Sequence, residues 1–335
     1  MTIDQKVGQL VLASLTYGET TSDLAAMVAG GKVTGVLLLG TGWSAVDVRQ
    51  AVMELNAAAA PPIGLYVAAD QEGGTVQRLS GAGFSAIPSA KVQGTWTTDK
   101  LTAQATVWGK EMLDAGVNLD LAPVADTVPA SLGRRNAPIG GLNRQFANDP
   151  AAVVTHASAF IAGLTAAGVS SCVKHFPGLG RVTGNTDYTR TGIVDSATTR
   201  TDPYVTAFKQ VMAAGPAMVM ISTATYKKID AAHPAAFSSI VINDLLRGQL
   251  GWTGVVISDS LDAVSVTKTT PQQRAVQFIA AGGDIAVFTS LASAQAAFAG
   301  LKAKAAASPE FAALVDAAVM RVLEAKVAAG LVADL

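Results

Sequence analysis

Short apolar runs rich in β-branched residues recur along the chain and alternate with longer, alanine-rich segments that have helical spacing. Nearly continuous apolar runs are typical of parallel strands covered by helices on both faces of a sheet. The pattern therefore predicts strands at Gly35–Gly40, Ile63–Asp70, Val117–Asp126, Val169–Phe176, Ala217–Thr223, Gly254–Asp259 and Asp284–Thr289.

The strand and helix segments alternate about seven times without a visible linker, which favours a closed α/β barrel over an open doubly wound sheet. We therefore predict a single (β/α)8 TIM-like barrel with irregular early strands. An amphipathic segment, Phe311–Leu331, is expected to be the last helix and to end near Gly330. Residues 1–335 are thus predicted to form one domain. No glycine-rich dinucleotide fingerprint or Walker motif follows any strand.

Composition narrows the range of partners. Of the 335 residues, 24 are basic and 25 are acidic, so the net charge of −1 gives no basic surplus for nucleic-acid binding. The single cysteine, Cys172, excludes intrachain disulfides and multi-cysteine metal sites. Residues 151–173 lack charge, but polar side chains and Gly168 interrupt them, which favours a helix leading into a strand over a membrane span.

The N-terminus, MTIDQKVGQLVLASL, lacks the basic start and uninterrupted apolar stretch of a signal peptide. Either the protein is retained in the cell, or its leader has been removed. The charged fraction of 15% and the abundance of alanine and glycine favour an exported or cell-envelope protein. We expect a monomer or a weak oligomer.

Polar side chains end several of the predicted strands. In a parallel barrel these strand ends meet on one face, where active sites are built. One such residue alone is explained by a helix N-cap, whereas several together predict a polar pocket. The residues at these ends are Asp70, Asp126, Lys174–His175, Thr223 and Asp259.

Two strand ends suggest specific chemistry. Lys174 is a candidate Schiff-base nucleophile or donor to substrate hydroxyls, and the alternative is a buried lysine paired with a carboxylate. His175 would face the opposite side of an ideal strand, so both side chains reach one ligand only if the chain bends at Pro177. Asp259 is placed to act as a nucleophile or to stabilise a cationic transition state, and otherwise as an N-cap.

The segment Asp70–Gly74 (DQEGG) places two acids around a glycine turn. No calcium-binding loop accompanies it, so we interpret the glycines as allowing close approach of the backbone to a small polar ligand. Neither a metal nor an organic cofactor is expected.

Together these segments resemble a known family, in order and across almost the whole chain. They are Asp4–Leu10, Ala69–Leu79, Asn118–Asp126, Gly141–Phe146, Lys174–Gly180, Leu245–Asp262 and Ala281–Asp284. The sequence resembles the catalytic barrel domain of glycoside hydrolase family 3, and within it the bacterial β-N-acetylglucosaminidase branch.

The resemblance implies a role for each matching residue. Asp259 would attack the anomeric carbon and form a covalent glycosyl-enzyme intermediate. The remaining matches would bind the hydroxyls of a terminal sugar, because charged side chains form strong, directional hydrogen bonds. These are Asp70, Arg78, Arg144, Lys174 and His175.

One loop departs from the resembled branch, which carries an Asp-x-His dyad whose histidine is the general acid/base. Counting from Lys174, Asn185 stands at the aspartate of the dyad and Asp187 at its histidine, so the segment is Asn185-Thr186-Asp187. Leu179, Thr75 and Thr223 also replace residues expected there. In one hypothesis Asp187 is the acid/base, about 5 Å from Asp259, with its pKa raised by that carboxylate.

In the other hypothesis the proton donor is lost, which would leave a non-catalytic or nearly inactive carbohydrate-binding barrel, or a partner chain supplies the acid. The changed loop also permits a different glycone specificity. We predict a retaining, exo-acting β-glycosidase of the β-N-acetylhexosaminidase type that acts on a carbohydrate, with cell-wall glycans as the expected context. A Schiff-base aldolase using Lys174 is a third hypothesis.

Overall fold

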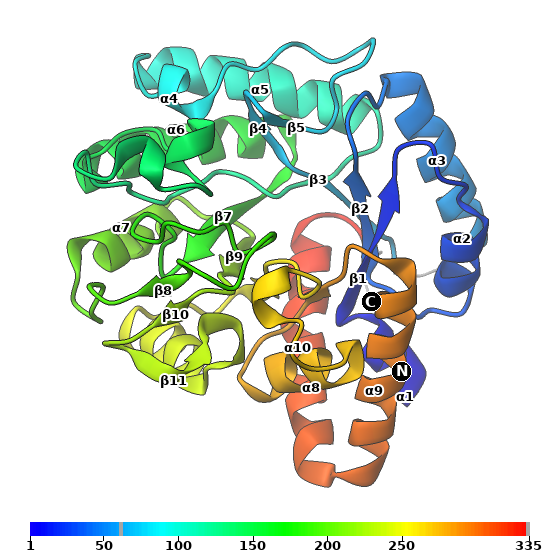
Figure 1. Ribbon diagram of the computed structural model, residues 1–335. Coiled ribbons are helices and arrows are strands. Elements are labelled where there is room, and N and C mark those ends of the chain that lie inside the picture. The colour runs from blue at the N-terminus through cyan, green and yellow to red at the C-terminus, as the bar shows by residue number, and fades with distance from the viewer. Residues whose placement is uncertain (60–62, 333–335) are drawn as a thin grey trace.

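The computed structural model describes residues 1–59 and 63–332. Within them, eight parallel strands form the central sheet (Figure 1): the first seven pair in chain order, and the last pairs with the first. A bridge between Ile257 and Ile285 joins the two ends of this sheet into a barrel. The strands are β1 (Val11–Thr16), β2 (Gly35–Leu39), β3 (Tyr66–Ala69), β6 (Leu119–Asp120), β7 (Ser170–Phe176), β9 (Met218–Ile221), β12 (Val255–Ser258) and β13 (Ala286–Val287).

The predicted α/β barrel is therefore confirmed, and the hydrophobic pattern predicts seven of its eight strands. It does not single out β1, whose apolar run follows helix α1 (Ile3–Gly8) without the turn residues that separate later elements. The first two strands, β1 and β2, pair continuously over five residues. The shortest ladders belong instead to β6 and β13. Pro123, which lacks a backbone N–H, follows β6 closely.

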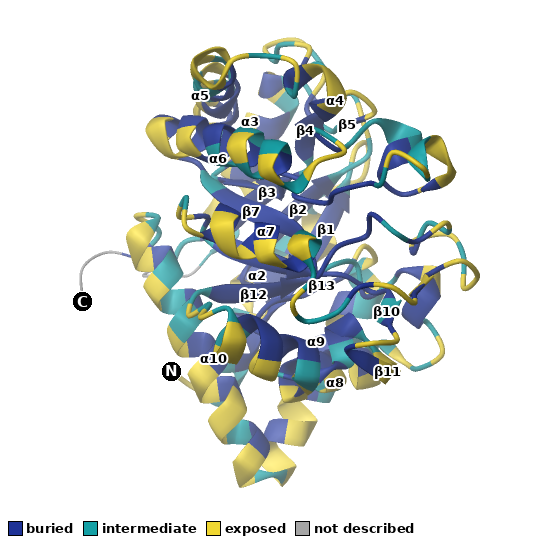
Figure 2. Cartoon of the chain, turned by 90° about the vertical axis from the view of Figure 1, so that its left-hand side faces the viewer, coloured by how far each residue is buried: buried dark blue, intermediate teal, exposed yellow. Residues whose placement is uncertain are grey.

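Helices surround the barrel, and their buried positions face the strands while exposed positions face outward (Figure 2). The remaining helices are α2 (Ser22–Ala29), α3 (Ala45–Ala58), α4 (Ala90–Gln93), α5 (Thr98–Asp114), α6 (Pro150–Ala167), α7 (Pro203–Met212), Ile240–Gln249, α8 (Pro271–Ala280), α9 (Leu291–Ala307) and α10 (Pro309–Ala328). Short strands and single helical turns occur in the loops, at β4 (Gln71–Gly73), β5 (Val76–Gln77), Gly133–Arg135, Gly140–Leu142, β8 (Val194–Asp195), β10 (Thr225–Tyr226), β11 (Asp230–Pro234), Ala235–Phe237 and Val264–Val266.

Helix α6 accounts for the uncharged stretch noted in the sequence. The side chain of Asp149 caps its first turn, and Gly168 ends it in the left-handed conformation at φ 82°. The helix is long and apolar enough to cross a membrane by length and composition. In the structure it packs against α5, α7 and β7, and β7 begins two residues after Gly168. The predicted helix leading into a strand is thus confirmed.

Two buried charges tie the C-terminal helix α10 to the barrel. Asp284 is fully buried and accepts hydrogen bonds from Arg247 at 2.7 Å and from Arg321 of α10 at 2.9 Å. Lys326 of α10 is also fully buried and donates to the carbonyl oxygens of Thr34 and Gly64, each at 2.8 Å. Burial lowers the pKa of Lys326 to about 7. A neutral amine has two N–H groups, which match the two carbonyls.

Candidate active site

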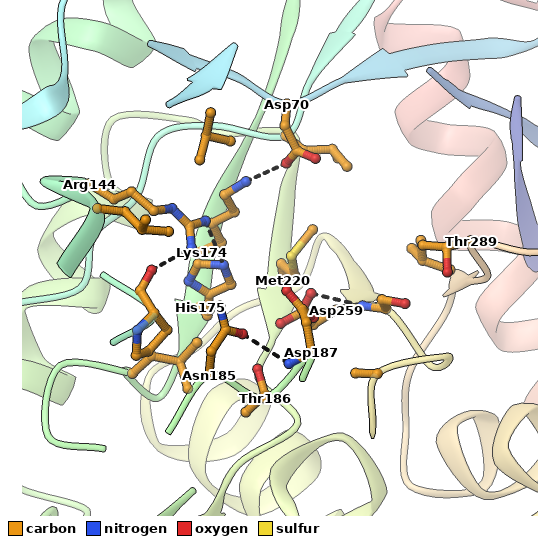
Figure 3. Close-up of a pocket in the computed structure, with 18 of the residues that line it drawn as sticks. Asp70, Arg144, Lys174, His175, Asn185, Thr186, Asp187, Met220, Asp259 and Thr289 are labelled. Carbon is orange, nitrogen blue, oxygen red and sulfur yellow. Dashed lines mark hydrogen bonds and ion pairs between the residues drawn. The ribbon is translucent and has the colours of Figure 1, made fainter. Parts of the chain in front are cut away.

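A cavity of about 770 Å³ opens among the loops at the carboxyl ends of the strands. Asp70 follows β3, Lys174 and His175 belong to β7, and Asp259 follows β12. All seven residues that the sequence predicts for the site line this one cavity, and Figure 3 shows all of them except Arg78 with labels. They are Asp70, Arg78, Arg144, Lys174, His175, Asp187 and Asp259.

A chain of ion pairs forms one wall. The Nζ atom of Lys174 lies 2.6 Å from Oδ1 of Asp70 and 2.6 Å from Oε1 of Glu72. Arg144 binds the same Glu72 carboxylate with two parallel hydrogen bonds, from Nε at 2.8 Å and from Nη2 at 2.7 Å. Arg78 lies at the edge of this group, with its Nε atom 4.0 Å from Oδ2 of Asp70. Three cations and two carboxylates are therefore held within one connected group.

The charges in this group fix each other's protonation. Burial alone would raise the pKa of Glu72, but Arg144 and Lys174 hold it well below its usual range. Burial alone would lower the pKa of Lys174, but Asp70 and Glu72 raise it above its ordinary value. The Lys174 amine is therefore protonated at neutral pH and cannot attack a carbonyl carbon. This geometry matches the alternative predicted from the sequence, a buried lysine paired with a carboxylate. It removes the basis for a Schiff-base aldolase.

His175 is held by a buried carboxylate. Its Nδ1 lies 2.6 Å from Oδ2 of Asp126, whose other oxygen accepts from the backbone N–H of Leu179 at 2.6 Å. Its Nε2 lies 3.3 Å from Nη2 of Arg144. A ring with its proton on Nδ1 donates to Asp126 and accepts from Arg144, so both contacts are satisfied. The ring orientation is thereby set before any ligand arrives.

The sequence predicted that a bend at Pro177 brings the two neighbouring side chains to one site. Both Lys174 and His175 do line the cavity, but the chain departs from a regular strand earlier than expected. The pairing of β7 with β9 shifts register between Val173 and Phe176. The peptide bonds Lys174–His175 and Phe176–Pro177 are both cis.

Asp259 and Asp187 form the other wall and point toward the same part of the cavity (Figure 3). Oδ1 of Asp259 accepts from the backbone N–H of Ser260 at 2.8 Å, and the next helix, α8, begins only at Pro271. Asp259 is therefore not the N-cap of that helix. Asp187 lies on the loop after β7, and its backbone N–H donates to the side chain of Asn185 at 2.9 Å.

The electrostatic setting of Asp187 differs from that of the paired carboxylates. Asp187 remains exposed to solvent at the mouth of the cavity, but the protein atoms crowded around its carboxyl group and the negative charge of Asp259 raise its pKa to about 6. Arg144 and His175 oppose this shift without cancelling it. A carboxyl group with such a pKa exchanges a proton near neutral pH, as a general acid/base must.

Two carboxyl groups beside the cavity residues, Glu72 and Asp120, were not predicted as part of the site. Glu72 binds both Lys174 and Arg144, and its position two residues after Asp70 in an extended segment was the available signal. Asp120, in β6, is buried and accepts from the backbone N–H of Gln71 at 3.0 Å. Burial raises the pKa of Asp120 to about 8.

The other two histidines serve elsewhere. His156 in α6 contacts the carbonyl oxygens of Ala152 and Trp96, and His233 contacts Asp230. In the part of the chain that the structure describes, no group of three or more histidine, cysteine or acidic side chains is arranged to hold a metal ion. Of the three histidines, His175 alone lines the cavity.

The fold and cavity define a class of protein: a (β/α)8 barrel with a pre-formed, charged site for a small polar molecule and two carboxyl groups on its open side. The family model for the glycosyl hydrolase family 3 N terminal domain matches residues 2–325. The chain belongs to glycoside hydrolase family 3, and the predicted resemblance is confirmed.

Individual relatives agree with this family. The chain is 36% identical over 243 residues to a β-hexosaminidase of Xylella fastidiosa strain M23, covering 70% of this chain and 69% of the relative. A solved β-N-acetylhexosaminidase structure from Beutenbergia cavernae superposes with a TM-score of 0.94 at 44% identity, covering 97% of this chain and 98% of the other. A family 3 β-N-acetylglucosaminidase from Paenibacillus sp. FPU-7 superposes with a TM-score of 0.85 at 26% identity, covering 100% and 64%.

Proposed function

We propose that this glycoside hydrolase is a retaining, exo-acting β-N-acetylhexosaminidase with Asp259 as nucleophile and Asp187 as general acid/base. The observation that carries the proposal is that the loop after β7 brings Asp187 to the same cavity as Asp259, where its pKa is raised to about 6. The relatives named β-hexosaminidase support the choice of sugar.

In the first step, a carboxylate oxygen of Asp259 attacks the anomeric carbon of the terminal sugar. The bond from that carbon to the glycosidic oxygen breaks, and the leaving oxygen takes the proton of Asp187. The products are a sugar esterified to Asp259, a free aglycone alcohol and an ionised Asp187.

In the second step, the Asp187 carboxylate takes a proton from water while the water oxygen attacks the anomeric carbon. The ester bond breaks, Asp259 returns to its carboxylate form, and Asp187 is protonated again. Two inversions at the same carbon give a product with retained configuration.

The wall of ion pairs would hold the sugar. Asp70, Arg78, Arg144, Lys174 and His175 present charged or polar atoms to the cavity. Most of these groups are already fixed by protein contacts, so little rotamer freedom is lost when the sugar binds. The volume of about 770 Å³ lies within the usual range for small-ligand sites.

The finer setting of the enzyme is part of the same proposal. We propose that the substrate is a glycan containing N-acetylhexosamine, such as a bacterial cell-wall fragment, and that the enzyme works as one domain without nucleic acid, metal or organic cofactor. Analysis of products released from purified cell-wall glycan, with mass spectrometry of the released sugar, tests this setting.

The direct test uses a panel of aryl β-glycosides with the wild type, Asp259→Asn and Asp187→Ala. Asp259→Asn should lose turnover, and Asp187→Ala should lose about 10²–10⁴-fold with phenyl leaving groups, in keeping with lost general acid catalysis. Azide should restore turnover of Asp187→Ala by forming a glycosyl azide, because azide needs no base. The exposed Asp244→Asn serves as the control.

Unchanged turnover in Asp259→Asn would disprove the nucleophile, and unchanged turnover in Asp187→Ala would disprove the acid/base. If no glycoside is cleaved while N-acetylglucosamine still raises the melting temperature, the protein is a carbohydrate-binding barrel. That alternative rests on the loop departure predicted from the sequence, in which Asn185-Thr186-Asp187 would stand in place of the Asp-x-His dyad of the resembled branch.

A further inference from the structure

The loop that carries Asp187 rests against the loop that follows Asp259. The backbone N–H of Val264 donates to the carbonyl oxygen of Asp187 at 3.2 Å, and that of Ser265 donates to Thr186 at 3.0 Å. These two bonds connect the segment with the proposed acid/base to the segment with the proposed nucleophile. The relative placement of the two carboxyl groups therefore depends on a contact between loops.

One side chain reinforces this contact. Arg190 donates from Nε to the carbonyl oxygen of Val264 at 3.1 Å and from Nη2 to Oγ1 of Thr267 at 3.0 Å. Thr267 in turn donates to the same Val264 carbonyl at 3.2 Å. The planar guanidinium suits two acceptors at once, which a lysine cannot match.

Within the loop, the hydrogen bonds around Asp187 are local: the backbone N–H groups of Tyr188 and Thr189 both donate to the carbonyl oxygen of Asn185 at 3.1 Å. The backbone N–H groups of Thr183 and Gly184 both donate to the carbonyl oxygen of Gly192 at 2.8 Å, which closes the base of the loop. Asp187 lies between these closing points, and its backbone is braced locally by Asn185 (Figure 3). Its carboxyl group accepts no hydrogen bond from residues 1–59 and 63–332, so its position follows from that of its backbone.

We propose that Arg190 is a positioning residue that fastens the loop after β7 to the loop after β12 and so places the Asp187 carboxyl beside Asp259. This inference rests on the acid/base role proposed for Asp187. Arg190 does not line the cavity, so it acts through the loop and not on the sugar.

The proposal predicts a dependence on the leaving group. A phenolate of low acidity leaves slowly unless it is protonated, whereas a 2,4-dinitrophenolate leaves without help, so only the first needs a well-placed acid. Removing the two bonds of Arg190 should lower kcat/KM about tenfold for phenyl β-N-acetylglucosaminide. The kcat/KM for the dinitrophenyl substrate, which reports the same first step, should change less than twofold.

The test compares wild type, Arg190→Ala, Arg190→Lys, Asp187→Ala and the double variant Asp187→Ala/Arg190→Ala. Lysine can reach one acceptor and should recover part of the loss. The kcat/KM of the double variant should be no lower than that of Asp187→Ala alone, because Arg190 acts only through the Asp187 carboxyl group. Arg134→Ala, an exposed arginine outside the cavity lining, is the matched control and should match wild type.

Each other outcome has a definite meaning. An Arg190→Ala variant that loses less than twofold with the phenyl substrate, or loses equally with both substrates, overturns the positioning role. An additional loss in the double variant does the same. If Asp187→Ala itself shows no dependence on the leaving group, the acid/base assignment fails first, and that result is read independently of Arg190.

Discussion

Glu72 is the residue whose loss should most disturb the ion-pair wall. Its side chain is 3% exposed and binds Lys174 at 2.6 Å and Arg144 at 2.7 Å. Glu72→Gln keeps the shape of the side chain and removes its charge, and it places amide hydrogens where two cations donate. The buried cations would then share too little negative charge.

The expected loss of stability follows from this geometry. Breaking a buried ion pair costs about 3–5 kcal/mol, and because Lys174 keeps Asp70 we take about 3 kcal/mol for Glu72→Gln. An unfolding entropy of about 2.1 cal/mol/K per residue gives about 0.7 kcal/mol/K for the 335-residue chain. The melting temperature should therefore fall by about 4 °C at pH 7.

Calorimetry at several pH values provides the measurement. Because the folded pKa of Glu72 lies below its ordinary value of 4.5, its stabilising effect is complete above that value and is lost as the pH falls through the folded pKa. The gap between wild type and Glu72→Gln should thus narrow below about pH 4. The exposed Glu324→Gln is the control. A melting temperature within 1 °C of wild type at pH 7 would refute the reasoning.

Three further predictions concern pH and the buried charges. In wild type, kcat/KM should fall as pH rises through about 6, because the free enzyme then loses the Asp187 proton needed by the leaving group; a flat profile to pH 8 contradicts this. Asp284→Asn should lower the free energy of unfolding by about 3–5 kcal/mol, measured by calorimetry. Its kcat should be unchanged because Asp284 lies outside the cavity lining, and a melting temperature equal to that of wild type would refute the prediction. The folded pKa of Lys326 is lowered to about 7 against 10.5 when unfolded, so unfolded chains bind more protons in between, and the unfolding free energy should rise from pH 7 to 10. Lys326→Met should lose that rise, and an identical pH dependence in both proteins would disprove the assignment.

The barrel was predictable because its signal is local and repeated. Strands such as β7 and β12 are apolar on both faces, and the helices before β7 and after β12 begin at the clear caps Asp149 and Thr270. Strand β1 was not predicted because the turn that separates it from α1 consists of Gln9 and Leu10, which are not typical turn residues. The end of β6 at Asp120 was not predicted because apolar residues continue beyond it to Val124.

The membership of the site was predictable, while its connections were not. Strand-end position and the family resemblance indicate Asp70, Lys174 and Asp259, since both are properties of short segments. The role of Glu72 depends on Arg144, which lies 72 residues away, and the contact of Arg190 with Val264 spans 74 residues. Such pairings arise only when the barrel closes, and one sequence carries no signal for them.

The arrangement of charge explains how one cavity can hold carboxyl groups of opposite behaviour. Glu72 lies 2.6 Å from the Lys174 amine and binds Arg144, and these cations hold its pKa well below the usual range. Asp187 instead meets the negative charge of Asp259, which favours its protonated form. Lys174 and Arg144 thus act mainly on Glu72, and Arg144 lowers the pKa of Asp187 only in part. Moving Asp187 away from Asp259 would therefore lower the pKa of Asp187. It would also lengthen the distance over which Asp187 must transfer a proton, so the position of the loop controls both the proton affinity of this carboxyl group and its distance from the reacting atoms.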